Sequence, residues 1–318
     1  MQLTKDTRVF ISGCGGMLGL AIYQRFSADC QVLATDIELN EPWLEYADVT
    51  CYEKTAQMAA RFKPHLIINL AALTDLEYCE KNINETWKTN ALGAENMALI
   101  SQKLNAVHVY IGTAGIFDGQ QEYYTDFDRP NPLSVYAKAK HHGEMAVERM
   151  LDKYFIFRAG WMMGGGLKKD KKFINKIYKQ IASGAQSLNV VDDKLGTPTY
   201  TVNFADSMFR ILQTDLFGLY NMVCQGSGSR FDVACEFIKL LGLEGRIPVK
   251  IVDSGHFQKE YFAPRPASEK LVNLKLESRG LNFMRDWREC LEDYSREFRQ
   301  ALLLKIKRPV VQKESVAV

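Results

Sequence analysis

Tyr136 and Lys140 are the two residues whose types and spacing most directly suggest chemistry. They lie four positions apart in a stretch with helical character, from about residue 134 to 151, so both side chains can point to the same side of a helix. A free tyrosine has a pKa of about 10, but a nearby positive charge favours the phenolate and lowers that pKa. Such a tyrosine can exchange a proton with a reacting oxygen. The alternative is a surface tyrosine beside a solvated lysine.

Thr113 is a third candidate, because it directly follows the apolar run at 107–111, which is typical of a buried strand. A hydroxyl at the end of that strand could hold a substrate oxygen beside Tyr136, or it could simply close the strand. Lys138 competes with Lys140, but it lies on another face of the helix. The adjacent His141 and His142 diverge on a helix, so they cannot jointly bind a metal, and we predict no metal site.

A glycine-rich turn stands near the start of the chain. Gly13, Gly16 and Gly19 lie between an apolar run at 8–12 and a helical stretch that reaches about residue 26. Glycine lets the backbone turn tightly and approach a pyrophosphate, and the start of a helix offers free N–H groups. We therefore predict a dinucleotide site that includes Gly13, Gly16, Met17 and Leu18. The alternative is a glycine turn used only for close packing.

Asp36 ends the second apolar run, about 20 residues after this turn, where a carboxylate can bind ribose hydroxyls. It would repel a 2′-phosphate, and no arginine follows it immediately. The sequence therefore favours NAD(H) over NADP(H). Asp48, which precedes Val49, is placed to reach the adenine ring, or else to cap a helix or turn.

A nicotinamide would complete the chemistry expected of Tyr136 and Lys140. Oxidised nicotinamide and the Lys140 ammonium would both lower the pKa of the phenol. Tyr136 could then donate a proton to a carbonyl oxygen as hydride arrives, with Thr113 beside it. Tyr136 and Lys140 would thus also contact the cofactor.

The elements that position these residues alternate between strand and helix. Further strands are expected at 65–70 and 154–157, with helical stretches at 53–64 and 85–104. This order predicts an α/β fold with a doubly wound parallel (Rossmann) sheet that binds its ligand at the carboxyl ends of the strands. We expect the nucleotide domain at 1–160, with a returning segment near 192–217. A smaller α/β substrate lobe would take 161–191 and 218–304, and 305–318 a flexible tail.

Composition excludes several classes of protein. The 318 residues include 40 basic and 38 acidic side chains, a net charge of +2, so neither nucleic acid nor an anionic membrane is an expected partner. No segment has the length and apolar character of a membrane span or signal peptide. The seven scattered cysteines show no metal-ligand spacing. We expect reduced thiols in a cytoplasmic protein.

Over nearly its whole length the chain resembles the dTDP-4-dehydrorhamnose reductase family and its nucleotide-sugar relatives. The resemblance begins with the glycine turn and continues through Asn69-Leu70-Ala71-Ala72-Leu73-Thr74 and the segment around Tyr136. The more informative segments come late in the chain. They are Arg158-Ala159-Gly160-Trp161, Gly196-Thr197-Pro198-Thr199-Tyr200-Thr201, Gly218-Leu219-Tyr220-Asn221 and Arg265-Pro266-Ala267-Ser268.

The resemblance implies roles for individual residues. Thr113, Tyr136 and Lys140 look like the catalytic trio of the family. Asp48 and Val49 match a cofactor-side motif, while Asn69, Ala71 and Ala72 look like the wall beside the cofactor. Four further positions fall where the family holds the nucleotide-sugar, and an arginine among them suits a diphosphate. These are Thr74, Leu76, Trp161 and Arg265.

The chain also departs from the family pattern. Ala114 and Gly115 stand where family reductases usually carry aspartate and tyrosine, and Lys172 replaces an asparagine before Phe173. These changes remove a carboxylate and an aromatic wall beside the sugar. They indicate an altered sugar pocket, and they speak against a 4,6-dehydratase.

Three functions fit these residues. The leading one is an NAD(P)H-dependent reductase of the 4-keto group of a nucleotide-linked 6-deoxysugar, in deoxysugar biosynthesis. The second is a nucleotide-sugar 4-epimerase that retains bound NAD. The third is a non-catalytic subunit resembling the regulatory subunit of methionine adenosyltransferase, against which the complete set of Thr113, Tyr136 and Lys140 argues. Some relatives form dimers, so a homodimer is compatible with each.

Overall fold

A parallel sheet of seven strands forms the centre of the molecule. The computed structural model describes residues 1–306. The strand order is β11-β6-β5-β4-β1-β2-β3, and every neighbouring pair is parallel. This arrangement confirms the predicted α/β, doubly wound fold. The strands are β1 (Arg8–Ser12), β2 (Gln31–Asp36), β3 (Leu44–Tyr46), β4 (Leu66–Asn69), β5 (Val107–Thr113), β6 (Tyr154–Ala159) and β11 (Gly218–Asn221).

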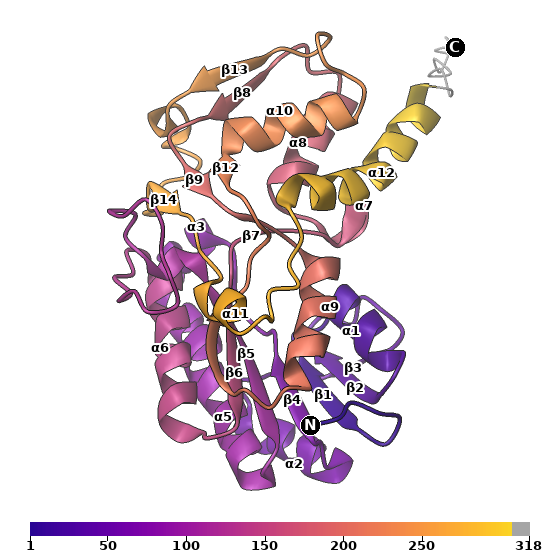
Figure 1. The fold of residues 1–318 in the computed structure, drawn as a ribbon, viewed down its shortest axis with the longest axis vertical. Coiled ribbons are helices and arrows are strands. Elements are labelled where there is room, and N and C mark those ends of the chain that lie inside the picture. Colours follow the sequence, from indigo (N-terminus) through magenta and orange to yellow (C-terminus); the bar gives the residue numbers. More distant parts are fainter. Residues whose placement is uncertain (307–318) are drawn as a thin grey trace, which may run out of the picture.

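Helices cover both faces of this sheet (Figure 1). The chain alternates between the faces because both sides of each strand are apolar. Val9 and Ile11 pack into the core shared with α1 and α9, where Phe26 meets Phe209 edge to face. Phe10 points to the opposite core. The helices are α1 (Gly19–Ser27) and α9 (Thr201–Leu212) on one face, and α2 (Tyr52–Phe62), α5 (Gly93–Leu104) and α6 (Val135–Met150) on the other.

The predicted helical stretch at 85–104 is interrupted. It begins as α4 (Ile83–Thr86), passes through a π-helical turn at Trp87–Leu92 and continues as α5. Just before it lies the short α3 (Leu76–Lys81). Such π turns commonly lie at functional sites. Here the turn aims Asn90 at Leu73, whose N–H and carbonyl it binds at 2.8 and 2.9 Å.

A second lobe lies beyond the end of the sheet (Figure 1). It is built from short strands and helices on either side of α9. Its strands are β7 (Trp161–Met163), β8 (Leu188–Val191), β9 (Leu195–Gly196), β10 (Pro198–Tyr200), β12 (Gly228–Ser229), β13 (Val249–Val252) and β14 (Ser268–Glu269). Its helices are α7 (Gly166–Lys169), α8 (Phe173–Ala182), α10 (Arg230–Leu240) and α12 (Trp287–Ile306), while α11 (Leu274–Ser278) contacts β11.

The boundary between the lobes differs from the prediction at both ends of the returning segment. The strand β9, inside the predicted range 192–217, pairs with β12 and β14 of the lobe. The strand β11, beyond that range, pairs with β6 of the main sheet. The returning chain therefore comprises α9 and β11. Strands of two to four residues are too short to show a period in the sequence, which explains the difference.

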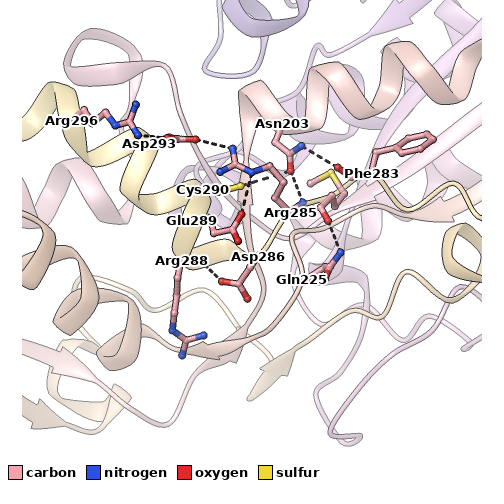
Figure 2. Close-up of polar contacts among 11 residues, drawn as sticks. Asn203, Gln225, Phe283, Arg285, Asp286, Arg288, Glu289, Cys290, Asp293 and Arg296 are labelled. Carbon is pink, nitrogen blue, oxygen red and sulfur yellow. Dashed lines mark hydrogen bonds and ion pairs between the residues drawn. The ribbon is translucent and has the colours of Figure 1, made fainter.

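Asn203 of α9 anchors the start of α12 (Figure 2). Its Oδ1 accepts a hydrogen bond from the backbone N–H of Arg285 at 2.9 Å, and its Nδ2 donates to the Phe283 carbonyl at 3.3 Å. The Arg285 guanidinium then pairs with Glu289 and Asp293 on α12. Through these contacts the last helix of the lobe is fixed to the nucleotide domain.

The predicted tail at 305–318 lies outside the described residues, apart from the end of α12 at Ile306. Within residues 1–306, no helix has the length and apolar character needed to cross a membrane.

Candidate active site

The glycine turn between β1 and α1 lies directly against the end of β4. Gly13 has a φ of +71°, and a Cβ built on it would stand 2.3 Å from the backbone nitrogen of Ala71. Only glycine satisfies both the backbone angle and this close approach. The predicted residues of the turn and of the Ala71-Ala72 segment are therefore neighbours in space.

Asp36 at the end of β2 fixes the outer side of the turn. Its Oδ2 accepts a hydrogen bond from the backbone N–H of Gly15 at 2.8 Å, and its Oδ1 accepts one from Glu38 at 2.9 Å. The carboxylate thus stands beside the turn, where the sequence placed it for a ribose.

Two features of this corner fit a bound dinucleotide. The first is the start of α1, where Leu18 makes no capping bond, the first turn holds no acidic residue, and Gly16 is exposed. An anion could therefore reach the free N–H groups. The second is Asn69, whose Oδ1 accepts hydrogen bonds from Ser12 and Ala71 while its buried Nδ2 has no partner in the described chain. A buried donor without a partner is costly, so Nδ2 favours a ligand oxygen.

Asp48 and Val49 lie in the loop between β3 and α2 and make local contacts. Asp48 Oδ1 accepts a hydrogen bond from the N–H of Thr50 at 2.8 Å, which makes it a turn-forming acid, the alternative role considered above. Val49 is buried against Gly93 at the start of α5, and its carbonyl accepts a hydrogen bond from Asn96. Contact of either residue with the adenine stays a prediction.

The second lobe also reaches this corner. Gly165 packs against Met17 of the turn. From α7, the nearly buried Lys169 extends its ammonium to within 3.0 Å of Glu41 and 3.4 Å of Asn40, which itself donates to the Gly15 carbonyl. The segment around α7 thus contacts the cofactor turn.

Tyr136 and Lys140 lie on the first turns of α6, and two contacts set the start of that helix. Ser134 caps it by accepting a hydrogen bond from Ala137 at 3.2 Å. Glu80 of α3 accepts one from the backbone N–H of Val135 at 2.7 Å. Because the acid binds the residue directly before Tyr136, the orientation of the tyrosine depends on α3 as well as on its own helix.

The surroundings of Tyr136 differ from the prediction. Burial raises the pKa of Tyr136 to about 12, the Thr113 hydroxyl acts in the opposite direction, and the nearby Cys79 and Glu269 raise it further. The lowering expected from Lys140 together with an oxidised nicotinamide stays a prediction. Desolvation of the phenolate dominates, so the phenol is protonated at neutral pH. A protonated tyrosine is what proton donation to a carbonyl requires.

The Lys140 side chain is buried against the ring of Tyr110. Its Nζ lies 4.1 Å from the centre of the Tyr110 ring, a cation–π contact, and it is almost fully buried. Burial lowers the pKa of Lys140 to about 7, although the Glu144 carboxylate opposes this shift. The lysine can therefore change its charge near neutral pH.

Trp161 is the centre of the lobe side of the site. Its Nε1 donates a hydrogen bond to Glu269 Oε2 at 2.7 Å, and the guanidinium of Arg230 stacks on its ring at 3.6 Å. Arg230 has no hydrogen-bonded or ion-paired side-chain partner among residues 1–306, and burial lowers its pKa to about 10, so it remains charged. A cation in this position favours an anionic ligand.

The other predicted substrate residues bridge the two lobes. Arg265 pairs with Glu77 of α3 through two contacts, Nη1 to Oε1 at 2.7 Å and Nη2 to Oε2 at 2.9 Å. Lys172, the departure noted in the sequence, donates to the carbonyl of Thr74 at 2.9 Å. Leu76 begins α3 between these two bridges and is half-buried. Thr74, Leu76 and Arg265 thus lie at the contacts between α3 and the lobe. Trp161 lies within the lobe, and binding of the sugar by any of the four stays a prediction.

Sequence reasoning missed three residues of this site: Glu77, Arg230 and Glu269. Arg230 begins α10 behind the capping box of Ser229, a local signal for a helix but not for a ligand. Glu269 directly follows the recognised segment that ends at Ser268. Their proximity to Trp161 arises only from the tertiary fold.

The chain is similar to known proteins over most of its length. A family model described as "RmlD substrate binding domain" matches residues 7–300. The spore coat polysaccharide biosynthesis protein SpsK of Bacillus subtilis is 29% identical over 293 residues, which cover 92% of this chain and 98% of the relative.

Two solved structures have the same architecture. A dTDP-4-dehydrorhamnose reductase of Clostridium acetobutylicum superposes with a TM-score of 0.82 and 31% identity, over 91% of this chain and 98% of its own. That of Bacillus anthracis, solved in complex with NADP, gives a TM-score of 0.83 and 28% identity over the same shares of the two chains.

Proposed function

Because the chain belongs to the RmlD substrate binding domain family, we propose that it is an NAD(P)H-dependent reductase of the 4-keto group of a nucleotide-linked 6-deoxysugar. The observation that supports this most is the constellation of Thr113, Tyr136 and Lys140 at the end of β5 and the start of α6. The lobe adds Arg230, whose guanidinium has no hydrogen-bonded or ion-paired side-chain partner among residues 1–306. Relatives and structural neighbours named as dTDP-4-dehydrorhamnose reductases support the same reaction.

In this proposal each residue has a separate task. A bound reduced nicotinamide supplies the hydride that reaches the keto carbon. Tyr136, protonated because its pKa is raised to about 12, donates its proton to the keto oxygen, which Thr113 steadies. Lys140 stabilises the phenolate that remains.

The diphosphate of the substrate would occupy the space in front of Arg230. Two more cations lie close to Arg230. Burial is the main cause of the lowered pKa of Arg230, and the charge of Arg265 lowers it further. The charge of Arg230 in turn contributes to lowering the pKa of Lys172, again after the larger effect of burial. Arg265 would exchange one contact with Glu77 for a phosphate oxygen, since a planar guanidinium can bind two oxygens at once. The nucleotide-sugar would then lie across the gap between α3 and the lobe.

For the cofactor, we propose that NADH is preferred to NADPH. Asp36, Glu38 and Glu41 place three acids around the ribose corner. Two cations of the lobe, Lys168 and Lys169, both pair with Glu41, at 3.4 and 3.0 Å, so the acids still outnumber the lysines by one. A 2′-phosphate would therefore meet net negative charge, and binding of NADP in the Bacillus anthracis relative must rest on different side chains or on a rearrangement of these pairs.

The test is a steady-state assay of reduced-nicotinamide oxidation with dTDP-4-dehydrorhamnose and related dTDP-4-keto-6-deoxyhexoses. We expect oxidation that depends on the sugar, with a higher kcat/KM for NADH than for NADPH. Tightly retained NAD and interconversion of sugars without net oxidation would instead indicate a 4-epimerase. Nucleotide binding without any turnover would indicate the regulatory class of protein. A homodimer stays a prediction, which sedimentation equilibrium can test.

A further inference from the structure

Gly115 brings the catalytic hydroxyl and a carboxylate of the lobe close together. It lies in the short 3₁₀ turn Ala114–Ile116, directly after Thr113. A Cβ built on Gly115 would stand 3.5 Å from Thr113 Oγ1 and 3.3 Å from Glu269 Oε1. The catalytic hydroxyl and the lobe carboxylate therefore both border Gly115. The carboxylate that Ala114 removes from this turn is thus replaced by one from the other lobe.

Glu269 is held firmly in this position. Its strand β14 pairs with β9, where Glu269 lies opposite Gly196. Its Oε2 accepts the hydrogen bond from Trp161 Nε1 at 2.7 Å. Its Oε1 faces Gly115, and within residues 1–306 this oxygen has no hydrogen-bond partner. One oxygen is therefore fixed, and the other is directed at the space beside Thr113.

The charge of Glu269 affects the phenol of Tyr136. It contributes to raising the pKa of Tyr136, after the larger effect of burial. It also acts on Arg230, which stacks on the other side of Trp161. Glu269 thus lies between the residue proposed to donate the proton and the residue proposed to bind the diphosphate, which is where the sugar itself must lie.

We propose that Glu269 determines substrate specificity by accepting, through Oε1, a hydrogen bond from a donor on the sugar carbon next to the keto carbon. This inference rests on the proposed function, since Thr113 and Tyr136 must hold the keto oxygen. In a 4-keto-6-deoxysugar, C5 carries only a methyl group, so the donor belongs to C3. The substrate class is therefore a 4-keto sugar with a hydroxyl or an amino group at C3.

The experiment compares three dTDP-4-keto-6-deoxysugars that differ only at C3: hydroxyl, amino and deoxy. For the wild-type protein we expect kcat/KM to be roughly 10- to 100-fold higher with a donor at C3 than with the deoxy compound, the usual range for a hydrogen bond to a charged group. The ratio between the amino and hydroxyl compounds then identifies the natural donor, and either result supports the inference.

Glu269→Gln changes the group that faces the sugar in a defined way, because the Trp161 hydrogen bond fixes the orientation of the side chain at position 269. The amide oxygen must accept the Trp161 hydrogen bond, so the amide NH₂ faces the sugar. It cannot accept a hydrogen bond, although it can donate one to the oxygen of a C3 hydroxyl. We expect the preference for the sugar with a protonated C3 amino group to fall to near one in this variant, because that group has only donors. Binding of dTDP alone should stay unchanged, which shows that the variant is folded. Glu292→Gln, an exposed acid on α12 of the same lobe, should keep the full preference.

Two outcomes would overturn the inference, and they differ in what they mean for the reaction. If the wild type reduces the deoxy compound as well as the hydroxyl compound, or if Glu269→Gln keeps the preference for the amino compound, Glu269 does not bind the C3 group while the proposed function stands. If the wild type reduces none of the three, the proposed function and the inference both fail.

Discussion

The two halves of the site differ in how their residues are brought together. In the cofactor half, Gly13, Asp36 and Asn69 all lie at the ends of adjacent strands of one parallel sheet. In the substrate half, Trp161 binds Glu269 across 108 positions of sequence, and Arg265 binds Glu77 across 188. The first half follows from the alternation of strands and helices along the chain. The second half depends on how the lobe of short strands packs against the nucleotide domain.

The two halves also differ in their charge. The cofactor corner holds acids whose contacts are already satisfied within the protein, such as Asp36 on two backbone N–H groups. The lobe holds Arg230, a cation with no such partner in the described chain. Substitutions in the lobe should therefore act mainly on binding of the sugar substrate, and those near the sheet on cofactor choice and on the chemical step.

The largest expected effect is on the chemical step. Tyr136→Phe removes the proton donor and should lower kcat by about 10²- to 10⁴-fold, the usual contribution of a general acid. Binding of NADH, followed by quenching of protein fluorescence, should stay within a few-fold of the wild type. A variant with full activity would show that another group donates the proton.

The next largest effect is on the KM for the nucleotide-sugar, and it should differ between Arg230 and Arg265. Arg230→Met should raise KM for the nucleotide-sugar by roughly 10- to 100-fold, because a charge-assisted contact to the diphosphate is lost. Arg265→Met should have a smaller effect, since Arg265 must first give up contacts with Glu77 at 2.7 and 2.9 Å. Arg299→Met, an exposed residue on α12, is the control. The opposite order of effects would contradict the assignment of Arg230.

The pH dependence tests the buried lysine. Burial lowers the pKa of Lys140 to about 7, so its charge is present below that pH and is lost as the pH rises. If the ammonium stabilises the phenolate, kcat/KM should fall about tenfold for each pH unit above that pKa. Lys140→Arg stays charged over the whole range and should lose this fall, whatever its absolute rate. A wild-type profile that is flat through neutral pH would argue against the role of Lys140.

The smallest effect concerns cofactor choice. Asp36→Asn removes one negative charge from the ribose corner and should raise the ratio of kcat/KM for NADPH to that for NADH by about tenfold or less. Glu45→Gln, an exposed acid on the neighbouring strand β3, should leave the ratio unchanged. An unchanged ratio in Asp36→Asn would mean that Asp36 does not face the 2′ position.

The sequence could predict the sheet and the catalytic trio because both depend on local spacing. Strand β1 was placed at 8–12 as observed, and Tyr136 and Lys140 lie on the predicted helix. The raised pKa of Tyr136 could not be foreseen, because it reflects burial in the folded protein.

The sequence also could not predict what the lobe contributes. Glu269 lies on a two-residue strand, and its meaning depends on its proximity to Gly115, which is more than 150 positions away in the chain. The sequence shows that Ala114 and Gly115 replace the aspartate and tyrosine usual in the family. Only the fold shows that the carboxylate of Glu269 lies beside this turn.

The most direct test of the account follows the hydride itself. NADH carrying deuterium at the transferred position of C4 is incubated with the protein and dTDP-4-dehydrorhamnose, and the sugar product is examined by NMR. The account predicts one deuterium at sugar C4 for each NADH oxidised in the wild type, and none within the same time in Tyr136→Phe. A product without deuterium, or an epimerised sugar formed without oxidation of NADH, would contradict it.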